Sequence, residues 1–360
     1  MRVIHVRNVR EALPMGIEYL LTEGHYEDSR VGRVLVSPCP VTTVYHNSQE
    51  RVLLSPIRDA NPFFHLMESL WMLSGSNDAR WLDYFVKDFS SRFAEEGGIQ
   101  HGAYGFRWRN HFDLDAGGHP CLPDQLNTIV ELLRADPKSR QAVLTMWDPV
   151  ADLGAKKKDL PCNTHIYFRI RDTEEEVANF IGGYTQSKLD ITVCCRSNDI
   201  VWGAYGANAV HFSVLQEYMA ARIGVGIGYY YQVSNNYHIY EHILHKVKGV
   251  VREFKTTLGY NFNNYYDEGV TPIVTVPDKF DRDLMCFMGT RGGRVLRVYK
   301  LEPPITYYNS WFTNTASPLF EGYELWRSGD RLKALEGIKA SKIAPDWKLA
   351  VVEWMERRMK

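Results

Sequence analysis

The sequence has no long run of apolar residues. No stretch approaches the roughly 20 apolar residues that a membrane-spanning helix needs. Residues 1–7 also lack the apolar core that a signal peptide carries. We therefore expect no membrane partner and a cytoplasmic location.

An excess of charge of one sign is also absent. The 42 Lys and Arg residues nearly balance the 43 Asp and Glu residues, and the formal net charge is -1. Affinity for a long polyanion is then not a property of the whole surface, and any phosphate site must be local. We expect no polymeric nucleic acid as a partner.

The six cysteines show no spacing typical of a disulfide framework or of a zinc site, and there is no CxxC motif. The two that are adjacent, Cys194 and Cys195, point to opposite faces if they lie in a strand. We predict reduced thiols and no metal. The six are Cys39, Cys121, Cys162, Cys194, Cys195 and Cys286.

The patterns that are present predict an α+β protein with its helices segregated from a run of strands. Asn61 as a cap, Pro62 at the first helical position and Gly75 at the end predict a buried helix over 61–75. Other helices are expected at 123–135, 208–222 and 237–254, and strands at 140–147, 164–171, 189–196 and 228–234.

The character of the sequence changes after residue 255. Irregular Gly-, Asn- and Tyr-rich sequence is followed by a strand-like stretch at 294–300 and by two helical stretches at 317–327 and 345–358. We predict a catalytic domain at 1–255 and a C-terminal helical extension at 256–360, packed on the catalytic domain or continuous with it.

Two residues stand where chemistry is expected. Cys162 heads an alternating segment and follows the basic residues 156–158, as a nucleophilic thiolate requires, although a packed structural thiol is the alternative. Glu68 lies in the middle of the apolar helix, where a carboxylate is costly unless it is paired or used. The alternative is that Glu68 points to solvent.

Three polar segments suit a nucleotide. Arg196 and Ser197 follow a strand, and a guanidinium with a hydroxyl satisfies several oxygens of a phosphomonoester, although a surface turn is the alternative. His238 and Tyr240 share one face if extended, where they suit a sugar hydroxyl. Residues 104–109 combine aromatic and basic side chains, which suits stacking or a surface patch.

In their order and spacing these motifs resemble the thymidylate synthase family over about residues 20 to 245. The motifs are Glu68-Ser-Leu-Trp71, Ala103-Tyr104-Gly105 with Trp108-Arg109, Asp136-Pro137 with Ser139-Arg140, Leu160-Pro161-Cys162, Arg196-Ser197-Asn198-Asp199 with Gly203, Asn208, and His238-Ile-Tyr240.

The resemblance implies a curved mixed β-sheet at a homodimer interface, a pyrimidine nucleotide as substrate and 5,10-methylenetetrahydrofolate as one-carbon donor. It implies that Cys162 attacks pyrimidine C6, that Glu68 organises water and protons and that Tyr104 helps to remove the C5 proton. The phosphate is assigned to Arg196, Ser197, Arg30 from a mobile loop and Arg140 from the partner subunit. The ribose is assigned to His238 and Tyr240, the base to Asn208, and the folate to Asp199 and Trp71.

Departures from the family pattern resemble its nucleotide hydroxymethylase branch, known from phages, for which the host cytoplasm is the expected location. Asn163 stands where the family usually has His after its cysteine, Gln141 replaces the second arginine of the cross-subunit pair, and Asn236 replaces an Asp. The tryptophan that excludes water in the synthases is missing from 83–94, where Ser90 is placed opposite it. A site that admits water yields a hydroxymethyl product, whereas one that excludes it allows hydride transfer and a methyl product.

Two alternatives stay open at this point. A thymidylate synthase is the nearer one, and a nucleotide- or RNA-binding regulator that has lost catalysis is the more remote one. An Asn amide at position 208 matches uracil, so dUMP is favoured over dCMP or CMP. However, the interval from Gly203 to Asn208 is one residue longer than in the family, so Ala207 is the other candidate for that position.

Overall fold

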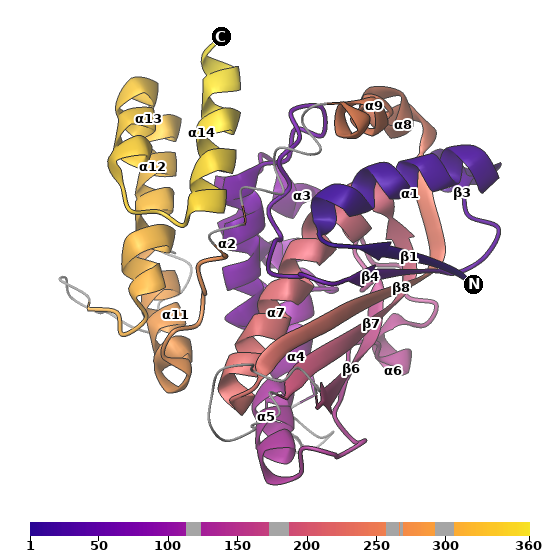
Figure 1. The fold of residues 1–360 in the computed structure, drawn as a ribbon, viewed down its shortest axis with the longest axis horizontal. Coiled ribbons are helices and arrows are strands. Elements are labelled where there is room, and N and C mark those ends of the chain that lie inside the picture. Colours follow the sequence, from indigo (N-terminus) through magenta and orange to yellow (C-terminus); the bar gives the residue numbers. More distant parts are fainter. Residues whose placement is uncertain (113–123, 173–186, 257–265, 267–268, 292–305) are drawn as a thin grey trace, which may run out of the picture.

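The computed structural model describes residues 1–112, 124–172, 187–256, 266, 269–291 and 306–360. Within this part of the chain a mixed sheet of eight strands forms the centre of the molecule (Figure 1). The strand order is β1-β4-β8-β7-β6-β5, and β3 of the β2–β3 hairpin also pairs with β8. The strands are β1 (Arg2–Val6), β2 (His25–Ser29), β3 (Gly32–Val36), β4 (Val41–Tyr45), β5 (Val143–Thr145), β6 (Asn163–Arg171), β7 (Lys188–Asp199) and β8 (Gly226–Tyr240).

Two long parallel neighbours, β7 and β8, align the predicted nucleotide segments. They are 12 and 15 residues long, so both extend beyond the strands that the sequence predicts. Their register pairs Ser197 with Asn236 and Asp199 with His238. The Arg196-Ser197 segment is therefore part of a strand and not a surface turn.

The C-terminal half of β8 corrects one predicted helix. A helix was expected from residue 237, but the strand continues to Tyr240 because β3 pairs with its end, Val36 with His238 and Val34 with Tyr240. The helices α8 (Glu241–Val247) and α9 (Gly249–Lys255) follow only then. β5 is also much shorter than the predicted strand 140–147.

One face of the sheet is covered by helices and the other is open within the described chain. α1 (Val9–Glu23), α2 (Pro62–Leu73) and α7 (Asn208–Ile223) lie on the covered side (Figure 1). Alternate residues of β6 show the difference, since Ile166 and Phe168 are buried whereas Tyr167 is 46% exposed. The homodimer that the sequence predicts at a curved sheet stays a prediction.

The remaining helical elements surround this arrangement. α2 begins as predicted, with the Asn61 side chain accepting from the backbone N–H of Phe64 and Pro62 in the first turn. The other elements are the 3-10 helices at Ala79–Tyr84 and Glu96–Gly98, α3 (Phe89–Phe93), α4 (Tyr104–Arg109), α5 (Gln125–Ala135), α6 (Pro149–Asp152) and the π-helical segment Ile200–Ala207. No helix in the described ranges is long and apolar enough to cross a membrane.

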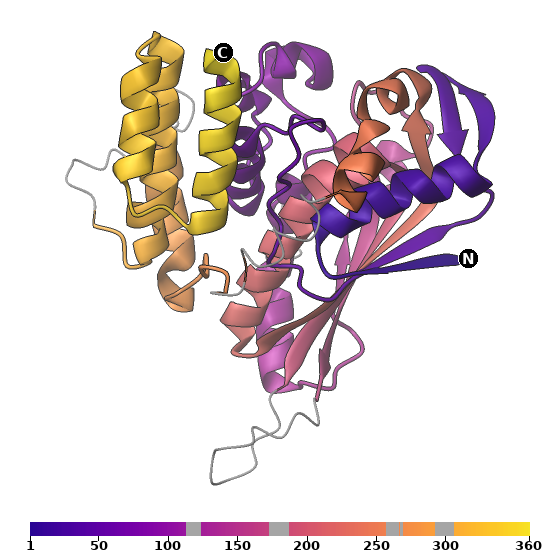
Figure 2. The same ribbon diagram turned by 45° about the horizontal axis from the view of Figure 1, so that its top comes forward.

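The C-terminal residues form a helical group against α2. Both views show these yellow and orange helices beside α2 (Figure 2). Phe63 of α2 contacts Tyr323 and Trp354, with ring centroids 4.7 and 5.7 Å away. The group comprises α11 (Pro277–Arg291), a π-helical turn (Phe312–Ala316), α12 (Ser317–Ser328), α13 (Arg331–Ala340) and α14 (Pro345–Met359), of which the sequence predicted α12 and α14. The strand predicted at 294–300 lies outside the described residues.

Candidate active site

Cys162 is held at the start of β6 by the neighbouring strand. Its carbonyl oxygen accepts from the backbone N–H of Arg196 at 2.9 Å. The Arg196 side chain folds back and donates to the carbonyl oxygens of Pro161 at 3.1 Å and Leu160 at 3.3 Å. The predicted nucleophile and the predicted phosphate arginine therefore belong to one rigid unit. The five cysteines in the described chain are free thiols, as predicted, and Cys121 lies outside it.

The electrostatic environment of Cys162 differs from the one that the sequence suggested. Burial raises the pKa of the Cys162 thiol, Arg196 lowers it in part, and Asp159 raises it further. Lys158, from the basic loop, donates instead to the backbone oxygen of Ser91. Arg196 therefore supplies the positive charge that was expected from residues 156–158.

Tyr104 reaches the residue next to the nucleophile. It begins α4, and its hydroxyl oxygen accepts from the Asn163 backbone N–H at 3.4 Å. Its ring stacks on Phe212 of α7, with centroids 5.8 Å apart. Burial, and then the neighbouring Cys162, raise the pKa of Tyr104 well above its ordinary value.

Asn163, which stands where the family usually has histidine, is completely buried. Its Nδ2 donates to the backbone oxygen of Cys194 at 2.8 Å, which joins β6 to β7. Its Oδ1 has no hydrogen-bond partner within the described residues. The Nδ2 group of Asn163 thus links the two strands, and its Oδ1 remains available to accept a hydrogen bond inside the protein.

Glu68 does not point to solvent, so the alternative considered for it is wrong. The side chain is buried, and its Oε2 lies 3.0 Å from Nε2 of His211 on α7, which is buried as well. Neither of these two atoms has a well-formed hydrogen bond to any described residue. Sequence reasoning missed His211, although its position three residues after Asn208 on the same helix was a signal.

Asp159 is a second residue that the sequence did not single out. Its Oδ2 accepts from Gln100 Nε2 at 2.8 Å. Burial raises the pKa of Asp159, the hydrogen bond from Gln100 and the neighbouring His101 and Arg196 oppose this rise, and Glu68 adds to it. Because its charge also acts on Cys162, this carboxyl belongs to the same polar site.

The predicted ribose residues lie together at the end of β8. The rings of His238 and Tyr240 meet edge to face with centroids 5.3 Å apart. His238 Nδ1 donates to Oδ1 of Asn236 at 2.7 Å, which leaves Nε2 for another partner. Asn236 therefore still orients the imidazole, although it replaces the acidic residue of the family.

The other predicted phosphate residues come from separate elements. Ser197 is half-buried in β7. Arg30 lies in the turn of the β2–β3 hairpin, and its charge lowers the pKa of Tyr240, which burial raises. Arg140 is exposed in the turn between α5 and β5. Arg30 and Cys162 thus both act on Tyr240, whereas Arg140 is exposed, and the phosphate roles of these arginines stay predictions.

Asp199 ends β7 and caps the π-helical segment. Its Oδ1 accepts from the backbone N–H groups of Val201 at 3.0 Å and Trp202 at 2.7 Å. Its Oδ2 is buried without a partner in the described chain, and burial raises its pKa. This oxygen fits a bound group that donates hydrogen bonds, such as the amino or amide N–H of a pterin.

The π-helical segment accounts for the longer interval between Gly203 and Asn208. A π-turn holds one residue more than an α-turn, and here the N–H of Asn208 bonds to the carbonyl oxygen of Gly203, five residues earlier. The additional residue is thus absorbed before α7 begins. Asn208 is buried, and its Nδ2 donates to Oδ1 of Asn198 at 3.1 Å. Its assignment to the base stays a prediction.

Two residues that the family resemblance places near the folate have hydrogen-bond partners within the chain. Trp71 is 1% exposed, and its indole N–H donates to the backbone oxygen of Asp78. Its assignment to the folate stays a prediction. Ser90 is the second residue of α3, and its hydroxyl donates to Oδ2 of Asp83 at 2.5 Å. Its placement opposite the tryptophan of the synthases stays a prediction.

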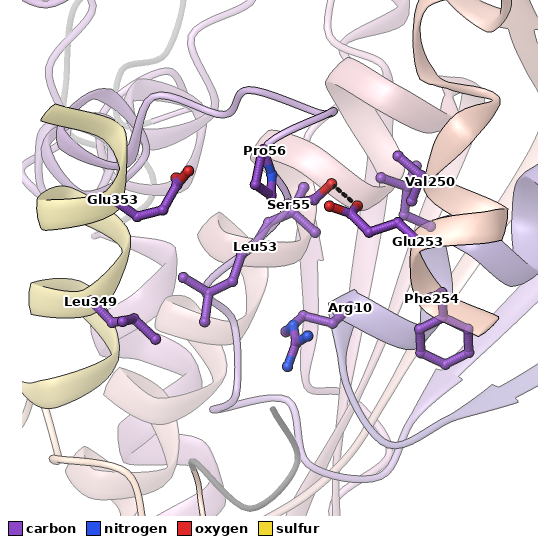
Figure 3. Close-up of a pocket in the computed structure, with 11 residues that line it drawn as sticks. Arg10, Leu53, Ser55, Pro56, Val250, Glu253, Phe254, Leu349 and Glu353 are labelled. Atoms are coloured by element: carbon purple, nitrogen blue, oxygen red, sulfur yellow. Dashed lines mark hydrogen bonds between the residues drawn. The ribbon is translucent and has the colours of Figure 1, made fainter. Parts of the chain in front are cut away.

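A separate cavity of about 220 Å³ lies between α1, α9, α14 and residues 53–56 (Figure 3). Ser55 donates to Glu253 at 2.6 Å across its wall. None of the predicted site residues lines this cavity. It is therefore distinct from the candidate active site.

Comparison with known proteins decides the family. The model of the family described as thymidylate synthase matches residues 15–265. This chain belongs to the thymidylate synthase family. A deoxyuridylate hydroxymethyltransferase of Pseudomonas phage M6 is 41% identical over 367 residues, covering 99% of this chain and 95% of that protein.

Other thymidylate synthase family relatives match over shorter ranges. A deoxyuridylate hydroxymethyltransferase of Bacillus phage SP01 is 36% identical over 203 residues, which cover 56% of this chain and 49% of that protein. A putative thymidylate synthase of Methanosarcina acetivorans is 27% identical over 251 residues, which cover 70% and 95%. The predicted family and its α+β fold are confirmed.

Proposed function

We propose that this protein is a deoxyuridylate hydroxymethyltransferase, a one-carbon transferase that converts dUMP to its 5-hydroxymethyl derivative. The observation that carries the proposal is the 41% identity, over 99% of the chain, to a phage protein with that name. The geometry supports it. Cys162, Tyr104 and Arg196 lie together where β6 begins beside β7, and Glu68 acts on the same polar site through Asp159.

Covalent attack by the Cys162 thiolate begins the proposed reaction. Its sulfur adds to C6 of the pyrimidine, which makes C5 nucleophilic. Arg196 and Ser197, with Arg30 from the hairpin, hold the 5'-phosphate so that C6 faces the sulfur. 5,10-Methylenetetrahydrofolate supplies the one-carbon unit when it is bound, and Asp199 offers an acceptor for its pterin.

The buried polar groups then move protons. C5 bonds to the one-carbon unit, Tyr104 helps to remove the C5 proton, and the bond between that unit and the folate nitrogen breaks with tetrahydrofolate as the leaving group, which leaves an exocyclic methylene at C5. Water adds to this carbon, and the Glu68–His211 pair takes the proton that the water loses. Electrons return from the O4 enolate, the C6–S bond breaks, and Cys162 leaves as a thiolate.

Further parts of the proposal concern the assembly and the sugar. Arg140, exposed in one subunit, is proposed to reach the phosphate of a partner subunit in a homodimer. His238 and Tyr240 are proposed to bind the ribose 3'-hydroxyl. The catalytic domain is proposed to end near residue 255, with the later helices packed on it.

The test is to incubate the enzyme with dUMP and methylenetetrahydrofolate, and to measure product mass and dihydrofolate absorbance together. We expect 5-hydroxymethyl-dUMP without stoichiometric dihydrofolate. Formation of dTMP with one dihydrofolate per product would establish a thymidylate synthase instead. Parallel reactions with dCMP and CMP identify the base and the sugar.

Cys162→Ala gives the matching mutational test. We expect turnover to fall by at least about 10⁴-fold, since no other group replaces the covalent step, while dUMP binding stays measurable. Cys194→Ala, at a half-buried thiol on β7, is the control and should retain activity. Retained turnover in Cys162→Ala would contradict the mechanism.

A further inference from the structure

Three buried side chains form a hydrogen-bonded chain that ends at the base-reading residue. Asn208 Nδ2 donates to Asn198 Oδ1 at 3.1 Å, and Asn198 Nδ2 donates to Ser234 Oγ at 3.1 Å. The exposed fractions are 5% for Asn208, 2% for Asn198 and 1% for Ser234. Water therefore does not compete for these bonds.

Asn198 is fixed more firmly than Asn208. It lies in β7, where its backbone pairs with Tyr237 of β8, and its side chain packs against Gly203. A Cβ at Gly203 would lie 2.6 Å from Asn198 Oδ1, so the glycine leaves room for that oxygen. Asn208, by contrast, is the first residue of α7 directly after the π-helical segment.

The direction of this chain decides what Asn208 offers to a base. With one Nδ2 hydrogen donated to Asn198, the amide retains Oδ1 and one N–H. These match uracil, whose N3–H donates and whose O4 accepts. The reversed amide turns its Oδ1 toward Asn198 and offers N–H groups, which suit the N3 acceptor of cytosine.

We infer that Asn198 is the positioning residue that orients the Asn208 amide and thereby makes the site select uracil over cytosine. The inference rests on the proposed function and on the assignment of Asn208 to the base that the family resemblance implies. Ser234 does not set the direction by itself, because a hydroxyl both donates and accepts. The orientation of the Asn198 amide therefore sets the direction of the hydrogen bonds among these three side chains.

Two substitutions at one position separate orientation from packing. Asn198→Asp keeps the shape and leaves only acceptors, so the Asn208 Nδ2 stays bound and uracil selection should be retained. Asn198→Leu keeps a similar shape without hydrogen bonds, so Asn208 is free to rotate. We expect the ratio of kcat/KM for dUMP to that for dCMP to fall at least about tenfold in Asn198→Leu, as for loss of one buried hydrogen bond.

The experiment measures this ratio for the wild type and both variants, together with dissociation constants of dUMP and dCMP in the absence of folate. Gln232→Leu is the matched control. This buried amide on β8 donates to the Ala204 carbonyl of the π-helical segment but is not part of the chain, so its loss should leave the ratio unchanged. Asn198→Ala, which adds no bulk, replaces the leucine variant if that one does not fold.

The outcomes are distinct. A lower ratio in Asn198→Leu with an unchanged ratio in Asn198→Asp supports the inference. An unchanged ratio in Asn198→Leu, or an equal fall in both variants, overturns it. If the wild type neither binds nor converts dUMP, the proposed function fails, irrespective of the variants.

Discussion

Two neighbouring side chains of opposite charge shift the pKa of the Cys162 thiol in opposite directions. Burial raises its pKa most, Arg196 on β7 lowers it, and Asp159 three residues earlier raises it. A nucleophile in this setting is mostly protonated until a ligand changes its surroundings. The two neighbours should therefore change its reactivity in opposite directions.

We predict that iodoacetamide alkylates Cys162 slowly at pH 8 and faster as pH rises, because only the thiolate reacts. Arg196→Gln should slow this alkylation and Asp159→Asn should accelerate it, each by up to about tenfold, the change in thiolate fraction for one pKa unit. Peptide mass spectrometry follows Cys162 separately from Cys194, the half-buried internal control. Changes of the same sign in both variants would show that the two charges do not act as described.

At this scale the sequence singled out candidate site residues but missed some of the side chains that lie beside them. Cys162 and Arg196 belong to motifs with recognisable order, and Asn198 was inside such a motif without an assigned role. His211 is on the buried side of a helix that resembles an ordinary core helix. Its partner Glu68 is far away in the chain, and only tertiary packing brings the two within 3.0 Å.

The π-helical segment Ile200–Ala207 leads directly into Asn208, the residue proposed to contact the base. Gly206 makes the segment possible because a Cβ there would lie 2.6 Å from the backbone oxygen of Val201 and 3.1 Å from Nη2 of Arg58. Arg58 itself donates twice to that Val201 oxygen. A side chain at position 206 would therefore displace either backbone or a buried guanidinium.

We predict that Gly206→Ala lowers the free energy of unfolding by about 1–3 kcal/mol, in the range of overpacked sites, and weakens dUMP binding by moving Asn208. Thermal unfolding and nucleotide titration measure the two effects. Gly337→Ala in α13 is the control, since nothing lies within 4 Å of its Cβ and a helical alanine should stabilise by up to about 1 kcal/mol. If both variants behave alike, the steric argument for Gly206 is wrong.

The sequence predicted α2, α5 and α7, but no element before residue 61 and not the ends of the strands. Of these three helices, α5 buries one face, whereas α2 and α7 are buried on nearly all sides. The end of β8 was misassigned, since its extension depends on pairing with a distant hairpin. The extra residue before Asn208 was visible as a spacing anomaly, but no local pattern indicated that a π-turn would absorb it.

At the scale of the whole molecule, a buried polar cluster connects the C-terminal helices to the catalytic part. Asp346, in the first turn of α14, is buried, and its Oδ2 has no partner in the described residues. Arg51 and Glu217 form a buried ion pair nearby, and both charges act on Asp346. Burial raises the pKa of Asp346 from 3.8 to about 6, which Arg51 partly opposes and Glu217 reinforces.

The raised pKa implies a definite pH dependence. Between pH 3.8 and about 6 the folded chain retains a proton on Asp346 that the unfolded chain has lost. This contribution to stability is fully present below the lower value and is lost as pH rises through the higher one. A shift of about two pKa units corresponds to a loss of up to about 3 kcal/mol at neutral pH.

We therefore predict that Asp346→Asn, which cannot ionise, unfolds at higher denaturant concentration than the wild type at pH 7.5, with the difference vanishing toward pH 4. Denaturant unfolding at several pH values measures it, and Asp330→Asn, at an exposed residue before α13, should show no such trend. If instead the wild type unfolds at higher denaturant concentration than Asp346→Asn at pH 7.5 and loses this advantage toward pH 4, ionised Asp346 stabilises the fold through Arg51. In that case the carboxylate would hold α14 on the catalytic part as an ion-pair partner. The trend that we predict means instead that α14 packs there despite the charge of Asp346, through apolar contacts such as Trp354 on Phe63.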